Sequence, residues 1–302
     1  MRVIAVNPVI SIIEEVYKAG FKVWNKLIET SITMFTQSPK DVASGDLYTK
    51  AESIYNAIVD VTVPLATLFF IIAIYKSLSS TPPEQQARKF MLDTIKYIII
   101  LYISTQLWNV MGYVVDFSDG ITTSVAGDLD SCQIPEDGND LFDEMNNFEF
   151  SGFDILDIGG SIADLFKDLF LLIVYFVGGL ASIFILGAAG ITVIGVAFQR
   201  IIKPLVIMPF GAIVLGIGSC SGEGERMMWH FGKSFLAFCI SGAFMVAAIK
   251  IGNSLITDYE LPTNDVSGSI KAILLIVKVD LSAIVITGLL KSMDGIVAKA
   301  FG

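Results

Sequence analysis

Three charged side chains stand inside apolar stretches of the C-terminal part of the chain: Lys250, Lys278 and Asp280. Charges within a membrane-spanning helix are costly, and they pair with one another or line an ion or proton pathway. Lys278 and Asp280 are too close in sequence to face each other on one helix, whereas Lys250 could meet Asp280 from a neighbouring helix. A transporter would use such a pair as a proton relay or ion site. The alternatives are a structural pair, or a lysine that extends to the membrane surface.

Other residues suited to catalysis or metal binding are few. His230, the only histidine, lies in the run MMWHF, which is typical of an amphipathic helix at the membrane surface. Cys132, Cys220 and Cys239 lie far apart, so we expect three free thiols rather than a disulfide framework or a zinc site. The sequence contains no GxxxxGK[ST] motif for ATP binding. We therefore expect a protein without enzymatic activity and without a cofactor.

The composition predicts that much of the chain lies in a lipid bilayer. Hydrophobic residues make up 54% of the 302 residues and charged residues 17%, with a mean hydropathy of +0.69. A soluble protein could not bury so much apolar surface, so we expect an all-α polytopic membrane protein. The net charge of −10 argues against a nucleic-acid-binding protein, which makes its contacts through Lys and Arg.

The elements that position these charges follow from two long uncharged runs in the centre. Leu169–Gln199 is 31 residues long, more than the roughly 20 that a helix needs to cross a bilayer. Arg200 and Lys203 follow it, and we expect them to form a basic elbow. The next uncharged run, 204–222, predicts a broken or re-entrant segment sheltered inside protein, because several of its residues disfavour a straight helix. These residues include Pro204, Pro209 and Gly211.

The remaining chain divides around this centre. We expect about five transmembrane helices in all, with the first two ending near Val115. The predicted parts are an N-terminal amphipathic helical region (1–53), the first two transmembrane helices (54–115), an acidic extracytoplasmic loop (116–167) and a C-terminal transmembrane core (168–302). In the N-terminal region the apolar residues recur at helical spacing, which predicts one helix or a pair broken near Gly20. Such a helix would either lie on the membrane, with Tyr17 and Trp24 among the headgroups, or pack on the rest of the protein.

The orientation follows from the distribution of basic residues. The segment Asp116–Asp164 holds 13 acidic residues and no Lys or Arg, whereas the turn before the second crossing, the elbow and the tail are basic. Lys and Arg favour the cytoplasmic side of a membrane. The pattern predicts a multi-pass protein of a bacterial cytoplasmic membrane, with the N-terminus outside, the C-terminus inside, the elbow inside and the acidic segment outside.

Small residues share one face of the long central helix: Gly178, Ala181, Ala188 and Gly195. Small side chains let helices approach closely in lipid. This face could pack within the chain or between copies arranged in a ring.

Two stretches carry a family resemblance. The long helix ends in QRIIKPLVIMPFGAIVLGI, and GEGERMMWHFGKSFLAFCISGAFMVAAI gives a short polar lead into the next helix. Together with the layout of crossings and loop, from about Ile54 to Gly302, the chain resembles the TrbL family. This family is the polytopic inner-membrane subunit of conjugative type IV secretion systems.

The resemblance implies a channel or scaffold subunit for DNA transfer, without catalysis of its own. It implies a homo-oligomeric ring that works beside ATPases, stalk or pilus-like components and bitopic membrane subunits, with DNA as the transported substrate. The acids of Asp116–Asp164 would repel DNA phosphates, so we expect this segment to contact protein. The alternative function is a secondary transporter or ion-coupled permease that uses the intramembrane charges.

Overall fold

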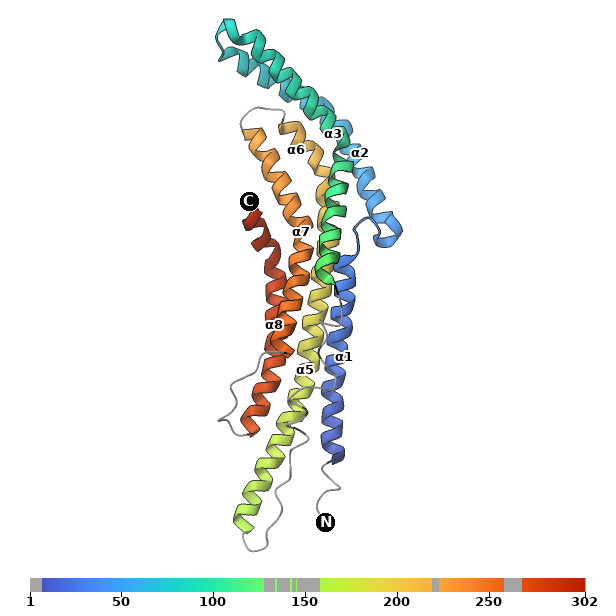
Figure 1. Cartoon of the computed structure of the whole chain (residues 1–302), viewed down its shortest axis with the longest axis vertical. Coiled ribbons are helices and arrows are strands. Elements are labelled where there is room, and N and C mark those ends of the chain that lie inside the picture. The colour runs from blue at the N-terminus through green and yellow to red at the C-terminus, as the bar shows by residue number, and fades with distance from the viewer. Residues whose placement is uncertain are drawn as a thin grey trace. The chain divides into compact units, whose positions relative to one another are not determined.

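The computed structural model (Figure 1) describes residues 7–127, 134, 142, 145, 158–218, 223–257 and 268–301. Most of these residues are helical, and none lies in a strand. The elements in chain order are α1 (Asn7–Thr36), η1 (Val42–Gly45), α2 (Asp46–Ser79), α3 (Pro83–Ala126), α5 (Ile158–Ile207), η3 (Met208–Phe210), α6 (Gly211–Gly218), α7 (Glu223–Thr257) and α8 (Gly268–Phe301).

Within the residues that the structure describes, five helical stretches are long and apolar enough to cross a membrane, which confirms the expectation of an all-α polytopic membrane protein. They are Val42–Ser79, Pro83–Ala126, Leu165–Gly218, Gly224–Ser254 and Ile273–Met293. Large apolar side chains stay exposed along them; Phe184 is 76% exposed and Ile71 62% exposed. An outward apolar surface of this kind suits lipid rather than water.

The chain forms two compact units. The first comprises Met1–Thr33, Asp128–Val196 and Ala247–Lys291, and the second comprises Met34–Gly127, Ala197–Val246 and Ser292–Gly302. Each unit gathers segments that lie far apart in the sequence, and several helices, among them α5 and α7, contribute to both.

In the first unit, α1 buries an apolar stripe. Tyr17, Phe21 and Trp24 are each at most 1% exposed. At Gly20, on the same stripe, a Cβ would lie 3.3 Å from Ile183 of α5, so the missing side chain lets the two helices approach closely. The predicted helix therefore exists but is continuous through Gly20, and its buried Tyr17 and Trp24 favour the packed helix over one lying among headgroups.

In the second unit, α2, α3 and α6 pack around Trp108 and Met208, which are 5% and 0% exposed. The rings of Tyr48 and Tyr55 on α2 lie 4.7 and 5.4 Å from that of Trp108. The Tyr55 hydroxyl donates a hydrogen bond to the carbonyl of Ser104 on α3. The bond satisfies a polar group that would otherwise be unpaired in an apolar core.

Candidate functional site

Arg200 lies inside α5 rather than at an elbow. The helix continues through Lys203 and Pro204 to Ile207, and the irregular turn is η3. Pro204 lacks the N–H that would bind the carbonyl of Arg200, which is why the sequence predicts a bend there. In membrane proteins neighbouring helices commonly hold such a proline within a helix. The expectation of an elbow at Arg200 and Lys203 is therefore wrong, and the break comes later.

The segment after Arg200 is sheltered inside protein, as its composition predicts. Pro204, Pro209 and Gly211 are all buried. A Cβ at Gly211 would lie 2.7 Å from the Leu107 side chain of α3, and one at Gly216 would lie 2.9 Å from Thr62 of α2. The glycines thus let α6 pack directly against both helices of the α2–α3 pair.

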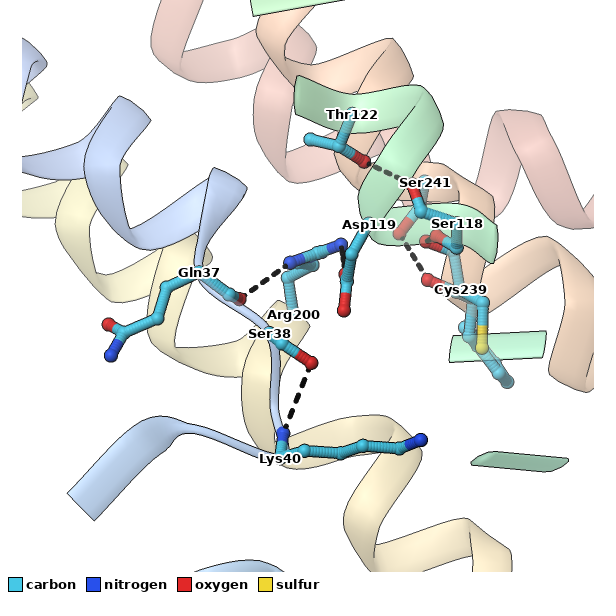
Figure 2. A network of polar contacts seen from close by, with 10 residues as sticks. Gln37, Ser38, Lys40, Ser118, Asp119, Thr122, Arg200, Cys239 and Ser241 are labelled. Atoms are coloured by element: carbon cyan, nitrogen blue, oxygen red, sulfur yellow. Dashed lines mark hydrogen bonds and ion pairs between the residues drawn. The ribbon is translucent and has the colours of Figure 1, made fainter. Parts of the chain in front are cut away.

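Arg200 forms a buried ion pair with Asp119 of α3 (Figure 2). Its Nη2 lies 2.6 Å from Asp119 Oδ1, and the two side chains are only 2% and 10% exposed. The guanidinium Nη1 also donates to the backbone carbonyl of Gln37, at 3.3 Å. Asp119 Oδ2 is buried and has no hydrogen-bond partner in the described part of the chain. Removing one partner of such a pair costs about 3–5 kcal/mol, because the other charge is left buried and uncompensated.

A second ion pair lies next to the first. Lys40 Nζ is 2.6 Å from Asp116 Oδ2 and 5.7 Å from the centre of the Tyr48 ring. Asp116 and Asp119 are three residues apart and so share one face of α3. The side chains of Lys40 and Asp116 are 27% and 49% exposed, so this pair contributes at most about 1 kcal/mol.

Helix α7 closes the remaining side of this site. The Ser118 hydroxyl donates to the carbonyl of Cys239, which joins α3 to α7 (Figure 2). At Gly242, a Cβ would overlap the Arg200 Nε, so only glycine leaves room for the guanidinium. We call Gln37, Lys40, Asp116, Asp119 and Arg200 the ionic cluster; it ties the α1–α2 connection to α3 and α5 within the second unit.

The ionic cluster contradicts one part of the predicted orientation, the placement of Arg200 and Asp119 on opposite sides of the membrane, while the sides of the two termini stay a prediction. Arg200 was expected on the cytoplasmic side, and Asp119, at the start of the acidic loop, on the outside. A hydrocarbon core of roughly 30 Å would separate these faces, but the two side chains are 2.6 Å apart. In addition, α3 continues past the expected end at Val115 to Ala126, so both acids belong to the helix and not to the loop.

The three predicted intramembrane charges do not form the expected pair. Lys250 and Lys278 are half-buried, and in the described chain neither forms an ion pair with Asp280. Asp280 is buried in the first unit, where its Oδ2 accepts a hydrogen bond from Ser182 Oγ at 2.9 Å. Its Oδ1 is buried and has no hydrogen-bond partner among the residues described. Serine on α5, not lysine, is therefore the observed partner.

Tyr17 lies near this carboxyl group. Burial, and secondarily the charge of Asp280, raise the pKa of the Tyr17 phenol above its usual range. The phenol donates a hydrogen bond to the carbonyl of Tyr175, 3.1 Å away. Helices α1, α5 and α8 thus enclose a small polar site in the first unit.

The four residues of the predicted small-residue face have different surroundings in the structure. A Cβ at Gly178 would lie 2.9 Å from the Tyr17 hydroxyl oxygen, so this residue packs within the chain. Ala181, Ala188 and Gly195 are exposed, and nothing lies within 4 Å of a Cβ placed at Gly195. Three of the four positions are therefore open to lipid or to another protein.

Most of the acidic segment, together with Cys132 and Cys220, lies outside the described residues. Three apolar residues of the segment are buried in the first unit: Ile134, Phe142 and Met145. Asn25 of α1 donates to the Ile134 carbonyl and accepts from its N–H, both at 2.8 Å. The Phe142 ring lies 5.9 Å from that of Phe21. Part of this segment therefore packs on α1.

Metal-binding side chains do not gather in the part of the chain that the structure describes. Among those residues no three or more His, Cys, Asp or Glu side chains are placed to hold a metal ion. His230 is exposed on α7, and Cys239 is a buried free thiol. Asp116, Asp119 and Gly242 were not predicted as site residues from the sequence. The sequence feature that could have pointed to the two aspartates is their spacing, three residues apart at the end of an uncharged run.

The fold and the ionic cluster define a polytopic helical membrane protein. Its irregular central segment, α5–η3–α6, is held by a buried ion pair. Comparison with models of protein families, with curated proteins and with solved structures finds no match to this chain.

Proposed function

We propose that the chain is a channel or scaffold subunit of a conjugative type IV secretion system, without catalytic activity, in the cytoplasmic membrane of a bacterium. One observation carries the proposal. The α5–η3–α6 segment, which bears the resemblance to the TrbL family, is an irregular stretch buried against the first two spans. A scaffold needs such a segment held in a fixed register, and the buried Arg200–Asp119 pair supplies a specific contact there.

The proposed partners are further copies of the chain, ATPases, stalk or pilus-like components and bitopic membrane subunits. The exposed stripe of Ala181, Ala188 and Gly195 supports packing between copies in a ring, since small residues permit close helix contact in lipid. DNA would be the transported substrate. The acidic segment after α3 would face protein rather than phosphate.

A mating assay tests this proposal. The gene is deleted from its host element, transconjugants are counted, and the gene is restored in trans as wild type, Arg200→Met or the double variant Arg200→Met/Asp119→Leu. We expect loss of transfer on deletion, full rescue by wild type, poor rescue by the single variant and substantial rescue by the double variant. Unchanged transfer after deletion would refute the proposal, whatever the variants do.

A second candidate function rests on Asp280, whose buried Oδ1 lacks a partner among the residues described. An intramembrane carboxyl group of this kind is a candidate for ion or proton coupling in a permease. Proteoliposomes containing the purified protein would then show a proton flux that Asp280→Asn abolishes. If Asp280→Asn supports normal mating and no flux is measured for wild type, the permease function is excluded.

A further inference from the structure

An apolar groove runs along the surface of the second unit. It has a volume of about 250 Å³ and lies between α2 and the α5–η3 segment. Its lining includes Ala51 and Ile54 on one side and Leu205 and Phe210 on the other. The charged residue in its lining is Lys50. The groove therefore combines a hydrocarbon-like interior with one cation.

The cation lies about one helical turn inside the end of the groove that Leu47 lines. Residues 47–54 of α2 lie beside 202–210 of the α5–η3 segment, and farther along both, Thr62 faces Gly216. The two segments therefore run in the same direction, from Lys50 toward Phe210. A molecule lying in the groove would place its charged end at Lys50 and its apolar part toward Phe210.

Lys50 lies in the charged first part of α2, before the apolar run that can cross a membrane. Asp46 and Glu52 lie within about one turn of it on the same helix, and Tyr48, whose ring faces the ammonium group of Lys40, lies two residues before it. Tyr, Trp and Lys concentrate where a membrane helix meets the headgroup layer. Beyond this level, residues 61–75 of α2 carry no charge. The groove thus leads from the interfacial layer toward the hydrocarbon.

Lys50 is available to an external anion. Its side chain is exposed, and among the described residues no carboxylate pairs with it. The neighbouring cations Lys40 and Arg200, by contrast, are both held by aspartates of α3. An ammonium group beside an anionic membrane surface gains about a fivefold preference for a negatively charged lipid.

We propose that this groove binds an anionic phospholipid, with its phosphate on Lys50 and one acyl chain along the groove. The groove volume of about 250 Å³ and its apolar lining leave room for part of one acyl chain. A peptide strand fits poorly, because the lining offers almost no groups to pair with its backbone. The site is independent of the proposed role in secretion.

The test is lipid retention by the purified full-length protein. The protein is reconstituted with equal amounts of phosphatidylglycerol and phosphatidylcholine, extracted in mild detergent, and its bound lipids are counted by native mass spectrometry. We expect wild type to retain phosphatidylglycerol about fivefold over phosphatidylcholine, and Lys50→Gln to lose this preference. Lys50→Arg should keep it. Lys76→Gln, a lysine at the other end of the same helix, is the matched control and should also keep it.

A second variant separates the acyl chain from the headgroup. Leu47→Trp places a larger side chain in the groove at a residue that is 37% exposed, and we expect it to reduce retention of both lipids while the protein stays monodisperse. Three results would overturn the proposal: Lys50→Gln retains phosphatidylglycerol like wild type, wild type shows no preference, or the groove is covered by a second copy of the chain. The last would appear as a dimer that Leu47→Trp dissociates with no change in bound lipid.

Discussion

Breaking the buried ion pair from one side should destabilise the second unit far more than breaking the exposed pair beside it. Arg200→Met leaves Asp119 in a site where its side chain is 10% exposed and both oxygens lack a cation. The expected loss is about 3–5 kcal/mol of the free energy of unfolding. Lys40→Met removes the neighbouring pair, whose members are much more exposed, and should cost at most about 1 kcal/mol.

The double variant Arg200→Met/Asp119→Leu gives the sharpest contrast. Replacing both charges by apolar side chains removes the desolvation cost along with the attraction, so its stability should return to within about 1 kcal/mol of wild type. The singles and the double form a cycle whose interaction energy should be at least about 2 kcal/mol. A repulsive or purely geometric role for Arg200 would leave the double variant as unstable as the single.

The assay is an SDS titration of the full-length protein in dodecylmaltoside, followed by tryptophan fluorescence. The chain has three tryptophans, and replacing Trp24 and Trp229 by Phe leaves Trp108 as the reporter in the second unit. Trp108 is 5% exposed, so its emission should shift to the red on unfolding. Unfolding of Arg200→Met at the same SDS fraction as Lys40→Met would show that the buried ion pair contributes no more than the exposed pair and would refute the prediction.

Three further predictions concern single positions. Gly242→Ala should destabilise the protein by about 1–3 kcal/mol in the same titration, because no room exists for a Cβ there; Gly232→Ala, on the same helix with nothing within 4 Å of its Cβ, should be neutral or stabilising. Asn25→Ala removes both hydrogen bonds to Ile134 and should speed limited proteolysis of the segment after α3, and equal cleavage rates would contradict that role. Cys239 is buried, so in a background whose other cysteines are serine it should react with maleimide only on unfolding, and rapid labelling of the folded protein would show the packing against α3 to be absent.

The sequence predicts the helices well because their signal is local. An uncharged run longer than a bilayer is thick, such as Leu169–Gln199, requires a spanning helix whatever lies beside it. The shelter of the segment containing Pro209 and Gly211 was equally predictable, since such residues at membrane depth must be covered by protein.

The predictions that were wrong concern residues whose contacts come from segments far away in the sequence. Asp116 and Asp119 lie in α3, where Lys40 and Arg200 approach them from elsewhere in the chain. The partner of Asp119 is 81 residues away in sequence, and the serine that binds Asp280 is 98 residues away. Charge counts along the chain cannot reveal such partners, so the acids were interpreted as a loop and the basic residues as an opposite face.

The sequence separation within the ionic cluster also bears on how the protein is made. Asp119 leaves the ribosome 81 residues before Arg200, and Ser118 leaves it 121 residues before Cys239. At about 5–20 residues per second, the first acid waits on the order of 4–16 seconds for its cation. During that interval the newly inserted α2–α3 hairpin carries an uncompensated carboxylate on the face that α5 will cover. Nascent chains halted before Arg200 therefore expose the Asp119 carboxylate without its cation, and an insertase can shield this group or a membrane protease can recognise it.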